Sequence, residues 1–248
     1  NPIPQRSNSK EGTQAAHLSA ILSARLGGAA ELDWAAFYKF TDLTAWQAHY
    51  RALTNFPSAP QALTPGEDVL LALTKFDPEL AELQAASGRA HAQFPIHYEE
   101  GFCAMLPHLS VLRQFARVAQ LRALSELSLG RTDAALADVR LALRLSDAVK
   151  TEPLLISSLV RITQLEVALQ PVWEGLARQR WSEAQLLELD RQLATVDLLA
   201  EVPRSIRGER NLGLAAIELI RRNPRSLAAG LGDMSNGERV IASRLMPT

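Results

Sequence analysis

Several kinds of functional signature are missing from this sequence. Its one cysteine, Cys103, cannot form a disulfide bond within the chain. No glycine-rich phosphate loop and no Gly-x-Ser-x-Gly motif occurs, and one cysteine with scattered histidines does not make a nucleophilic pair. No apolar run reaches the ~20 residues that a membrane-spanning helix needs. We therefore predict no catalytic residue, cofactor or bound metal from motifs, and no transmembrane segment in this chain.

An excess of charge of either sign is also lacking. Lysine and arginine number 26 against 27 aspartates and glutamates, a net charge of −1. Such a balance gives no global electrostatic reason to bind nucleic acid or an anionic membrane. Six arginines between residues 204 and 225 make the C-terminal helix locally basic, but aromatic residues for base stacking are absent there. A solvated or salt-bridged face is the simpler interpretation, and no nucleic-acid partner is predicted.

Leucine and alanine are abundant and β-branched residues are sparse, which favours helices. The clearest pattern covers residues 104–149, where apolar residues recur at steps of about three and four on two segments. Gly130 ends the first helix, and Thr132 with Asp133 supplies the start of the second. A connection this short predicts adjacent antiparallel helices, and the whole pattern predicts an all-α fold.

Small and apolar residues of this helix pair resemble positions of the tetratricopeptide repeat, a helical hairpin of about 34 residues. They are Ala123, Gly130, Ala135, Ala142 and Leu143. Thr132 and Val139 stand where that family usually has aromatic residues, and Asp147 stands where it usually has proline. The resemblance covers one repeat, since the next inter-helix turn, at 179–182, follows after roughly fifty residues. It implies an irregular stack of antiparallel helical hairpins that binds other proteins.

Aromatic residues divide the chain. Twelve of the fourteen lie at or before Phe115. The core of the N-terminal part should therefore be rich in aromatic side chains, whereas that of the remainder should be rich in leucine. We predict a disordered linker, an aromatic-rich helical cap, a helical-hairpin stack and a loose glycine-containing end, all of which could form one domain. Their ranges are 1–12, 13–103, 104–229 and 230–248.

Local signals mark individual helices. Capping boxes are predicted at Thr44, Thr64 and Ser182, each followed three residues later by Glu or Gln. Pro171 falls inside a long apolar pattern and predicts a kink or break near Gln170.

Two arginine pairs at i, i+4 spacing lie on the central hairpin. Arg113 with Arg117, and Arg140 with Arg144, could line one face of the stack and bind an acidic peptide. This leads to the favoured function, a non-enzymatic interaction or scaffold module with a groove between hairpins. A purely structural envelope protein is one alternative.

Histidines and carboxylates gather at residues 91–108, where the aromatic cap meets the hairpin stack. His97, Glu99, Glu100 and His108 are the donors a metal or acid–base site would use. Their spacing lacks the i, i+4 pattern of helical metal sites, so loop and helix-end packing is the simpler interpretation. A metal-dependent or acid–base enzyme with its site at this seam remains the second alternative.

Glu166 interrupts an apolar stripe that runs from Leu155 to Trp173. A carboxylate on such a stripe is costly if buried, unless it is paired. It could be an interior acid of the seam site, or an arginine such as Arg122, Arg140 or Arg161 could neutralise it, as it could Glu126.

The start of the chain bears on its location. The polar segment 1–12 contains Pro2 and Pro4 and resembles the linker after a signal peptide or membrane anchor. This favours an exported or envelope-anchored protein, with a trimmed cytoplasmic protein as the alternative.

Overall fold

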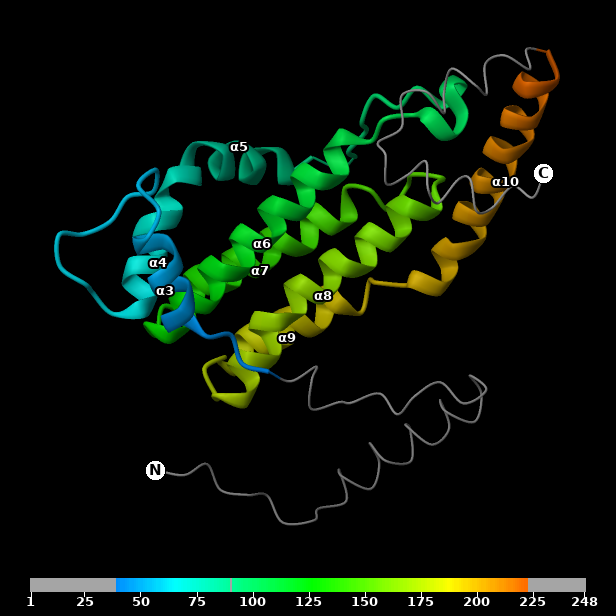
Figure 1. Cartoon of the computed structure of the whole chain (residues 1–248). Helices are drawn as coiled ribbons and strands as arrows, with labels where there is room; N and C mark the ends of the chain where they lie inside the picture. Colours follow the sequence, from blue (N-terminus) through cyan, green and yellow to red (C-terminus); the bar gives the residue numbers. More distant parts are fainter. Residues whose placement is uncertain (1–38, 90, 223–248) are drawn as a thin grey trace, which may run out of the picture. The chain divides into compact units, whose positions relative to one another are not determined.

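The computed structural model describes residues 39–89 and 91–222, and within them every element is helical, as predicted (Figure 1). The α-helices are α3 (Leu43–Arg51), α4 (Pro65–Leu73), α5 (Asp77–Ser87), α6 (Pro107–Ser128), α7 (Thr132–Asp147), α8 (Leu155–Ala177), α9 (Glu183–Leu193) and α10 (Leu198–Arg222). The 3₁₀-helices are η1 (Thr74–Phe76) and η2 (Tyr98–Cys103). The chain divides into two units between Thr41 and Asp42, and all of these helices belong to the second unit. The predicted linker 1–12, the start of the predicted cap and the predicted C-terminal segment 230–248 lie outside the described residues.

Helices α6 and α7 end and begin where the sequence predicted. Gly130 adopts a φ of 75°, a left-handed conformation that L side chains rarely take. Beside it, the Arg131 amide donates to the Glu126 carbonyl at 2.9 Å and satisfies the end of α6. The three-residue connection keeps the two helices packed along one another.

Helix α8 packs against both α6 and α7, and the three long helices lie side by side in Figure 1. Their shared interior is built from small and branched apolar side chains, which allow close helix approach. Fully buried examples are Ala116, Ala119, Ala123, Ala135, Val139, Ala142 and Ala168. Because protein interiors are close-packed, the loss of even one buried methyl group from this interior should lower stability.

Helix α8 is turned differently from the prediction. The stripe containing Leu155, Leu159 and Ile162 is exposed, and Glu166 on the same stripe is exposed as well. The opposite face is buried although it carries polar residues; its members include Ser157, Arg161, Gln164, Leu165, Ala168 and Val172. The expectation of a buried carboxylate at Glu166 is therefore wrong.

Two further expectations about proline and caps are corrected. The predicted break near Gln170 is absent, because α8 continues through Pro171 to Ala177. The cap of α3 is Asp42, not Thr44: its carboxylate accepts from the amides of Thr44 and Ala45 at 2.9 and 3.0 Å.

Capping boxes at Thr64 and Ser182 are confirmed. At the second, Gln185 donates to Thr132 and Asp133 at the start of α7, at 3.1 and 2.8 Å, while its oxygen accepts from the Ser182 amide at 3.0 Å. One side chain therefore both caps α9 and fastens α9 to α7.

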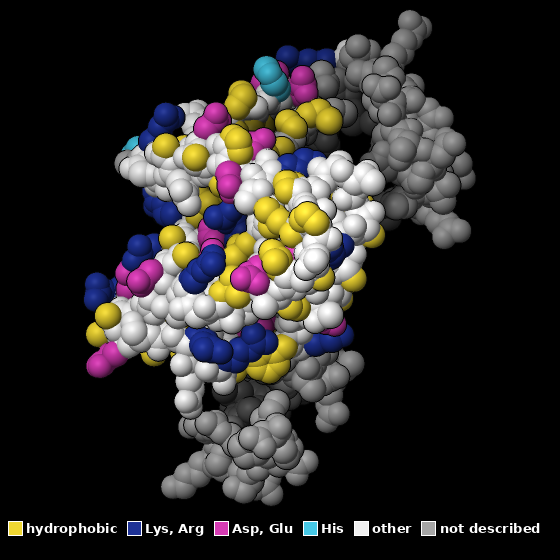
Figure 2. Space-filling model, turned by 90° about the vertical axis from the view of Figure 1, so that its left-hand side faces the viewer, with side chains coloured by type: hydrophobic (Ala, Val, Ile, Leu, Met, Phe, Trp, Pro, Cys, Tyr) yellow, Lys and Arg dark blue, Asp and Glu magenta, His cyan; other side chains and the backbone are white. Residues whose placement is uncertain are grey.

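Aromatic rings join the N-terminal helices of this unit to α6. Neighbouring ring centroids lie 5.0 to 6.3 Å apart along a row whose members are Trp46, Tyr50, Phe56, Phe76 and Phe115. Such separations suit edge-to-face and offset contacts. On the face shown in Figure 2, hydrophobic side chains lie in small groups among charged ones.

Helix α10 closes the described chain. It begins at Leu198, after Asp197 accepts from the Ala200 amide at 2.9 Å, and it includes Pro203. Pro203 is the sixth residue of α10 and has no N–H, so it removes one helical hydrogen bond, the one to the carbonyl four residues earlier. Helix α10 packs on α8 and on η2.

Candidate functional site

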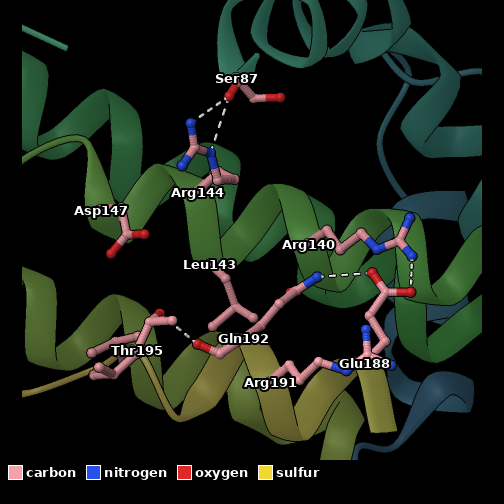
Figure 3. A pocket seen from close by; sticks show the side chains of 11 residues that line it. Ser87, Arg140, Leu143, Arg144, Asp147, Glu188, Arg191, Gln192 and Thr195 are labelled. Atoms are coloured by element: carbon pink, nitrogen blue, oxygen red, sulfur yellow. Dashed lines mark hydrogen bonds and ion pairs between the residues drawn. The ribbon is translucent and has the colours of Figure 1, made fainter. Parts of the chain in front are cut away.

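A cavity of about 610 Å³ lies where α7 and α9 face one another, and Figure 3 shows it. Helix α8 and the end of α5 complete its wall. The lining residues are Ser87, Arg140, Leu143, Arg144, Asp147, Leu165, Glu188, Arg191, Gln192, Thr195 and Val196. We call this the α7/α9 cavity.

Helical spacing explains which side chains line it. On α7, Arg140, Leu143, Arg144 and Asp147 follow one another at steps of three, one and three, which place them on one face. On α9, Glu188 and the polar residues three and four positions later share a face in the same way. The cavity is therefore bounded by two polar helix faces over an apolar floor.

Arg140 and Glu188 form an ion pair across the cavity, visible in Figure 3. Gln192 donates to the same carboxylate at 3.0 Å, one turn further along α9. Glu188 is therefore held by two groups and its charge is compensated by Arg140. The pair joins α7 to α9 at one side of the cavity.

Arg144 ties the end of α5 to α7. Its guanidinium donates to the Ser87 carbonyl at 2.6 and 3.0 Å (Figure 3). It also donates to the Arg89 carbonyl at 3.0 Å. Carbonyls at the end of a helix carry partial negative charge, so an arginine there is favourable. These acceptors are neutral groups, and no carboxylate among the described residues forms an ion pair with Arg144.

Asp147 is the second carboxylate of the cavity, and it is already engaged. Its oxygen accepts from Arg161 at 2.8 Å, and Arg161 also bonds Glu201 at 2.5 Å. The Arg161 side chain is only 2% exposed, so two partners compensate a buried cation. Asp147 therefore adds little free negative charge to the cavity.

Arg191 supplies positive charge without compensation. Its side chain lines the cavity from α9, and within the described residues no carboxylate pairs with it. With Glu188 and Asp147 both paired, Arg144 and Arg191 leave an excess of positive charge at the wall. An anionic group would find two guanidinium donors there.

Two smaller cavities adjoin the first. One of about 300 Å³ shares Ser87, Arg144 and Asp147 with it, and one of about 360 Å³ shares Asp147. Lys150 and His91 line both smaller cavities, and Arg89 lines the first of them. We call the three cavities together the groove; its excess of cationic side chains extends along its length.

The predicted arginine pairs separate. Arg140 and Arg144 line the groove, whereas Arg113 and Arg117 are exposed on α6 and line none of its three cavities. The structure therefore places half of the predicted face at the candidate site.

The predicted seam cluster also separates, into two histidine–carboxylate pairs. His97 and Glu99 are exposed and 3.0 Å apart; Glu99 raises the pKa of His97 by a hydrogen bond and by its charge. His108 instead bonds Glu152 at 2.9 Å in a largely buried position, with the Phe94 ring stacked on it. Over the described part of the chain, no three His, Cys, Asp or Glu side chains converge as metal ligands would.

Glu100 is exposed and belongs to neither pair. The arginines proposed to neutralise Glu166 and Glu126 pair with other acids: Arg122 with Asp77 and Asp138, Arg140 with Glu188, and Arg161 with Asp147 and Glu201. Glu126 instead has Arg131 at 3.5 Å.

Arg191, Gln192 and the Ser87 carbonyl are cavity groups that the sequence did not predict. The i, i+3, i+4 spacing on α9 was readable, but it does not say which helix that face meets.

No protein-family model, no curated protein and no solved structure matches this chain. Among residues 39–89 and 91–222, no helix is both long enough and apolar enough to cross a bilayer.

Proposed function

We propose that the protein is a non-enzymatic interaction module that binds an acidic peptide segment in the groove. The observation that carries the proposal is the charge balance of the α7/α9 cavity. Its two carboxylates, Glu188 and Asp147, are already paired, while Arg144 and Arg191 have no carboxylate partner among the described residues. A peptide carboxylate would supply the negative charge that both guanidinium groups lack.

The shape of the groove supports an extended ligand. Three adjoining cavities, about 610, 300 and 360 Å³, follow the ends of α5 and α7 and reach the segment at His91. Each alone has the size of a small-molecule site, but cavities that share walls suit a chain with several side chains. The proposal includes α6 to α9 as a tetratricopeptide-like stack of antiparallel hairpins, in which helix faces present the groove.

The test is binding of a labelled glutamate-rich peptide, followed by fluorescence anisotropy, with a lysine-rich peptide of equal length as reference. We expect preference for the acidic peptide and a fall in affinity with added salt. Arg191→Glu should weaken binding at least tenfold, because it replaces an uncompensated cation by an anion and disturbs no ion pair.

A matched control comes from α6. Arg113→Glu/Arg117→Glu changes two exposed arginines that lie outside the groove, so affinity should change less than for Arg191→Glu alone. Equal binding of the acidic and lysine-rich peptides would contradict the proposal. A larger loss in the α6 variant would move the site to the face of α6.

A further inference from the structure

Helices α8 and α10 carry an exposed apolar surface that the groove does not use. They run in opposite directions, because their contacts ascend along one helix as they descend along the other. In order, the contacts are Leu155 amide to Glu209 at 3.2 Å, Ser158 to Ser205 at 2.5 Å, and Arg161 to Glu201 at 2.5 Å. The two helices therefore form a closely packed pair.

The exposed apolar residues of both helices turn to the same side of this pair. On α8, Leu159 and Ile162 directly follow residues that contact α10; on α10, Val202 and Ile206 directly follow residues that contact α8. One residue rotates a helix face by about 100°. Because the helices run in opposite directions, the two rotations bring both apolar faces to one side.

We call the exposed apolar residues on this side of the helix pair the α8/α10 patch. Its members are between 39% and 83% exposed: Leu155, Leu159, Ile162, Leu199, Val202 and Ile206. A cluster of large exposed side chains on two adjacent helices is a feature of interaction surfaces.

Basic residues border the patch on α10. Arg207 and Arg210 follow Ile206 by one and four positions, are exposed, and have no carboxylate partner among the described residues. The nearby carboxylates Glu201 and Glu209 are turned to α8, where they accept from Arg161 and from the Leu155 amide. The outward charge beside the apolar side chains is therefore positive, although the whole chain is nearly neutral.

We propose that the α8/α10 patch docks on the surface of an anionic phospholipid bilayer. Apolar side chains beside exposed basic residues are the combination by which helices lie in the interface of such membranes. A second copy of the chain would bring the same arginines against this surface, whereas anionic headgroups complement them. Glu166, exposed one turn beyond Ile162 on α8, is the opposing charge at the edge of the patch.

The experiment is flotation of the full chain with vesicles of phosphatidylglycerol and phosphatidylcholine, compared with vesicles of phosphatidylcholine alone. We expect binding to the anionic vesicles that falls with salt. Arg207→Gln/Arg210→Gln should weaken it about thirtyfold, from about fivefold for each arginine near the surface. Leu159→Glu/Ile206→Glu should abolish it, and Glu166→Gln should strengthen it.

Matched controls lie on α9. Leu187→Glu alters an equally exposed leucine, and Arg191→Gln alters a groove arginine; both should bind vesicles like the unchanged protein. All these positions are exposed, so unchanged circular dichroism will show that the variants fold. Equal binding to both vesicle types, or anionic binding that survives Leu159→Glu/Ile206→Glu, would overturn the proposal. Self-association lost in that variant, without vesicle binding, would assign the patch to a second copy instead.

Discussion

His108 and Glu152 lie 44 positions apart and form a largely buried hydrogen bond of 2.9 Å. The other oxygen of Glu152 accepts from Ser157 at 2.5 Å, so one carboxylate fastens the start of α6 to the start of α8. Only 11 positions before His108, the His97–Glu99 pair uses the same chemistry in solvent. The two pairs consist of the same residue types and differ in burial, so a comparison of them shows the effect of burial alone.

Replacement of Glu152 by alanine should destabilise the fold by about 2–4 kcal/mol, because it leaves His108 and Ser157 buried without their partner. Urea unfolding followed by circular dichroism measures this loss. The control is Glu99→Ala, which removes an exposed partner and should change stability by less than about 1 kcal/mol. Similar losses in the two variants would show that the Glu152 pair contributes no more than the exposed one.

Asp138 should make stability depend on pH. Burial raises its pKa to about 6, although Arg122, 3.3 Å away, acts in the opposite direction. An acid whose pKa is higher in the folded chain contributes stability that is fully present below about pH 4 and lost as the pH rises through about 6. Relative to Asp138→Asn, the unchanged protein should lose up to ~3 kcal/mol between about pH 4 and 7.

Unfolding free energies at several pH values across this interval will test that dependence. Asp77→Asn is the control, since Asp77 pairs with the same Arg122 but is about half exposed. If the difference between the unchanged protein and Asp138→Asn is constant with pH, burial of this carboxylate does not control its protonation.

The orientation of α8 can be tested with two leucines. Leu165 is 6% exposed and packs in the core, whereas Leu159 is 53% exposed. Leu165→Ala should cost about 2–5 kcal/mol and Leu159→Ala less than about 1 kcal/mol. Thermal and urea unfolding supply both values. The reverse order would restore the orientation that the apolar stripe predicts.

Gly208 allows α10 to approach the chain just before α8. A Cβ atom there would lie 1.7 Å from the carbonyl oxygen of Pro153, so Gly208→Ala requires the two backbones to separate. We expect a loss of at least ~2 kcal/mol in unfolding free energy. Gly88→Ala is the matched control, because its Cβ would make only an ordinary van der Waals contact, 3.8 Å from the Ala85 carbonyl oxygen, at a helical φ of −73°. This change should be neutral or slightly stabilising. Equal effects would mean that the close contact is readily relieved.

Helix starts and ends could be predicted from the sequence where a few neighbouring residues determine the backbone conformation. Gly130 ends α6 and the boxes at Thr64 and Ser182 begin α4 and α9. Each satisfies backbone groups within one turn of the helix end: carbonyls at the end of α6, and amides at the starts of α4 and α9. At the start of α3, Thr44 matches the capping-box pattern, but Asp42, two residues earlier, forms the cap. Several adjacent cap-forming residues compete, and the geometry of the entering chain selects among them.

Which face of α8 is buried does not follow from the residues of α8 alone. The stripe from Leu155 onward has the stronger apolar pattern, yet α8 buries the face of Arg161 and Gln164. Ion pairs to Asp147 and Glu201 compensate the buried arginine, and small residues such as Ala168 on the same face permit close packing. Partners from α7 and α10 are separated from Arg161 in sequence, so periodicity within α8 does not include them.

By itself the sequence determined the helical class, the α6–α7 connection, two of the caps and the i, i+4 arginine pair at 140 and 144, since each depends on residues within a few positions. Tertiary structure alone decided that Arg140 meets Glu188, that Arg191 lacks a carboxylate among the described residues, and that Glu166 faces outward. Those outcomes depend on which helix faces come together. That choice is made by the summed burial and charge compensation of all packed helices, a property that no single segment contains.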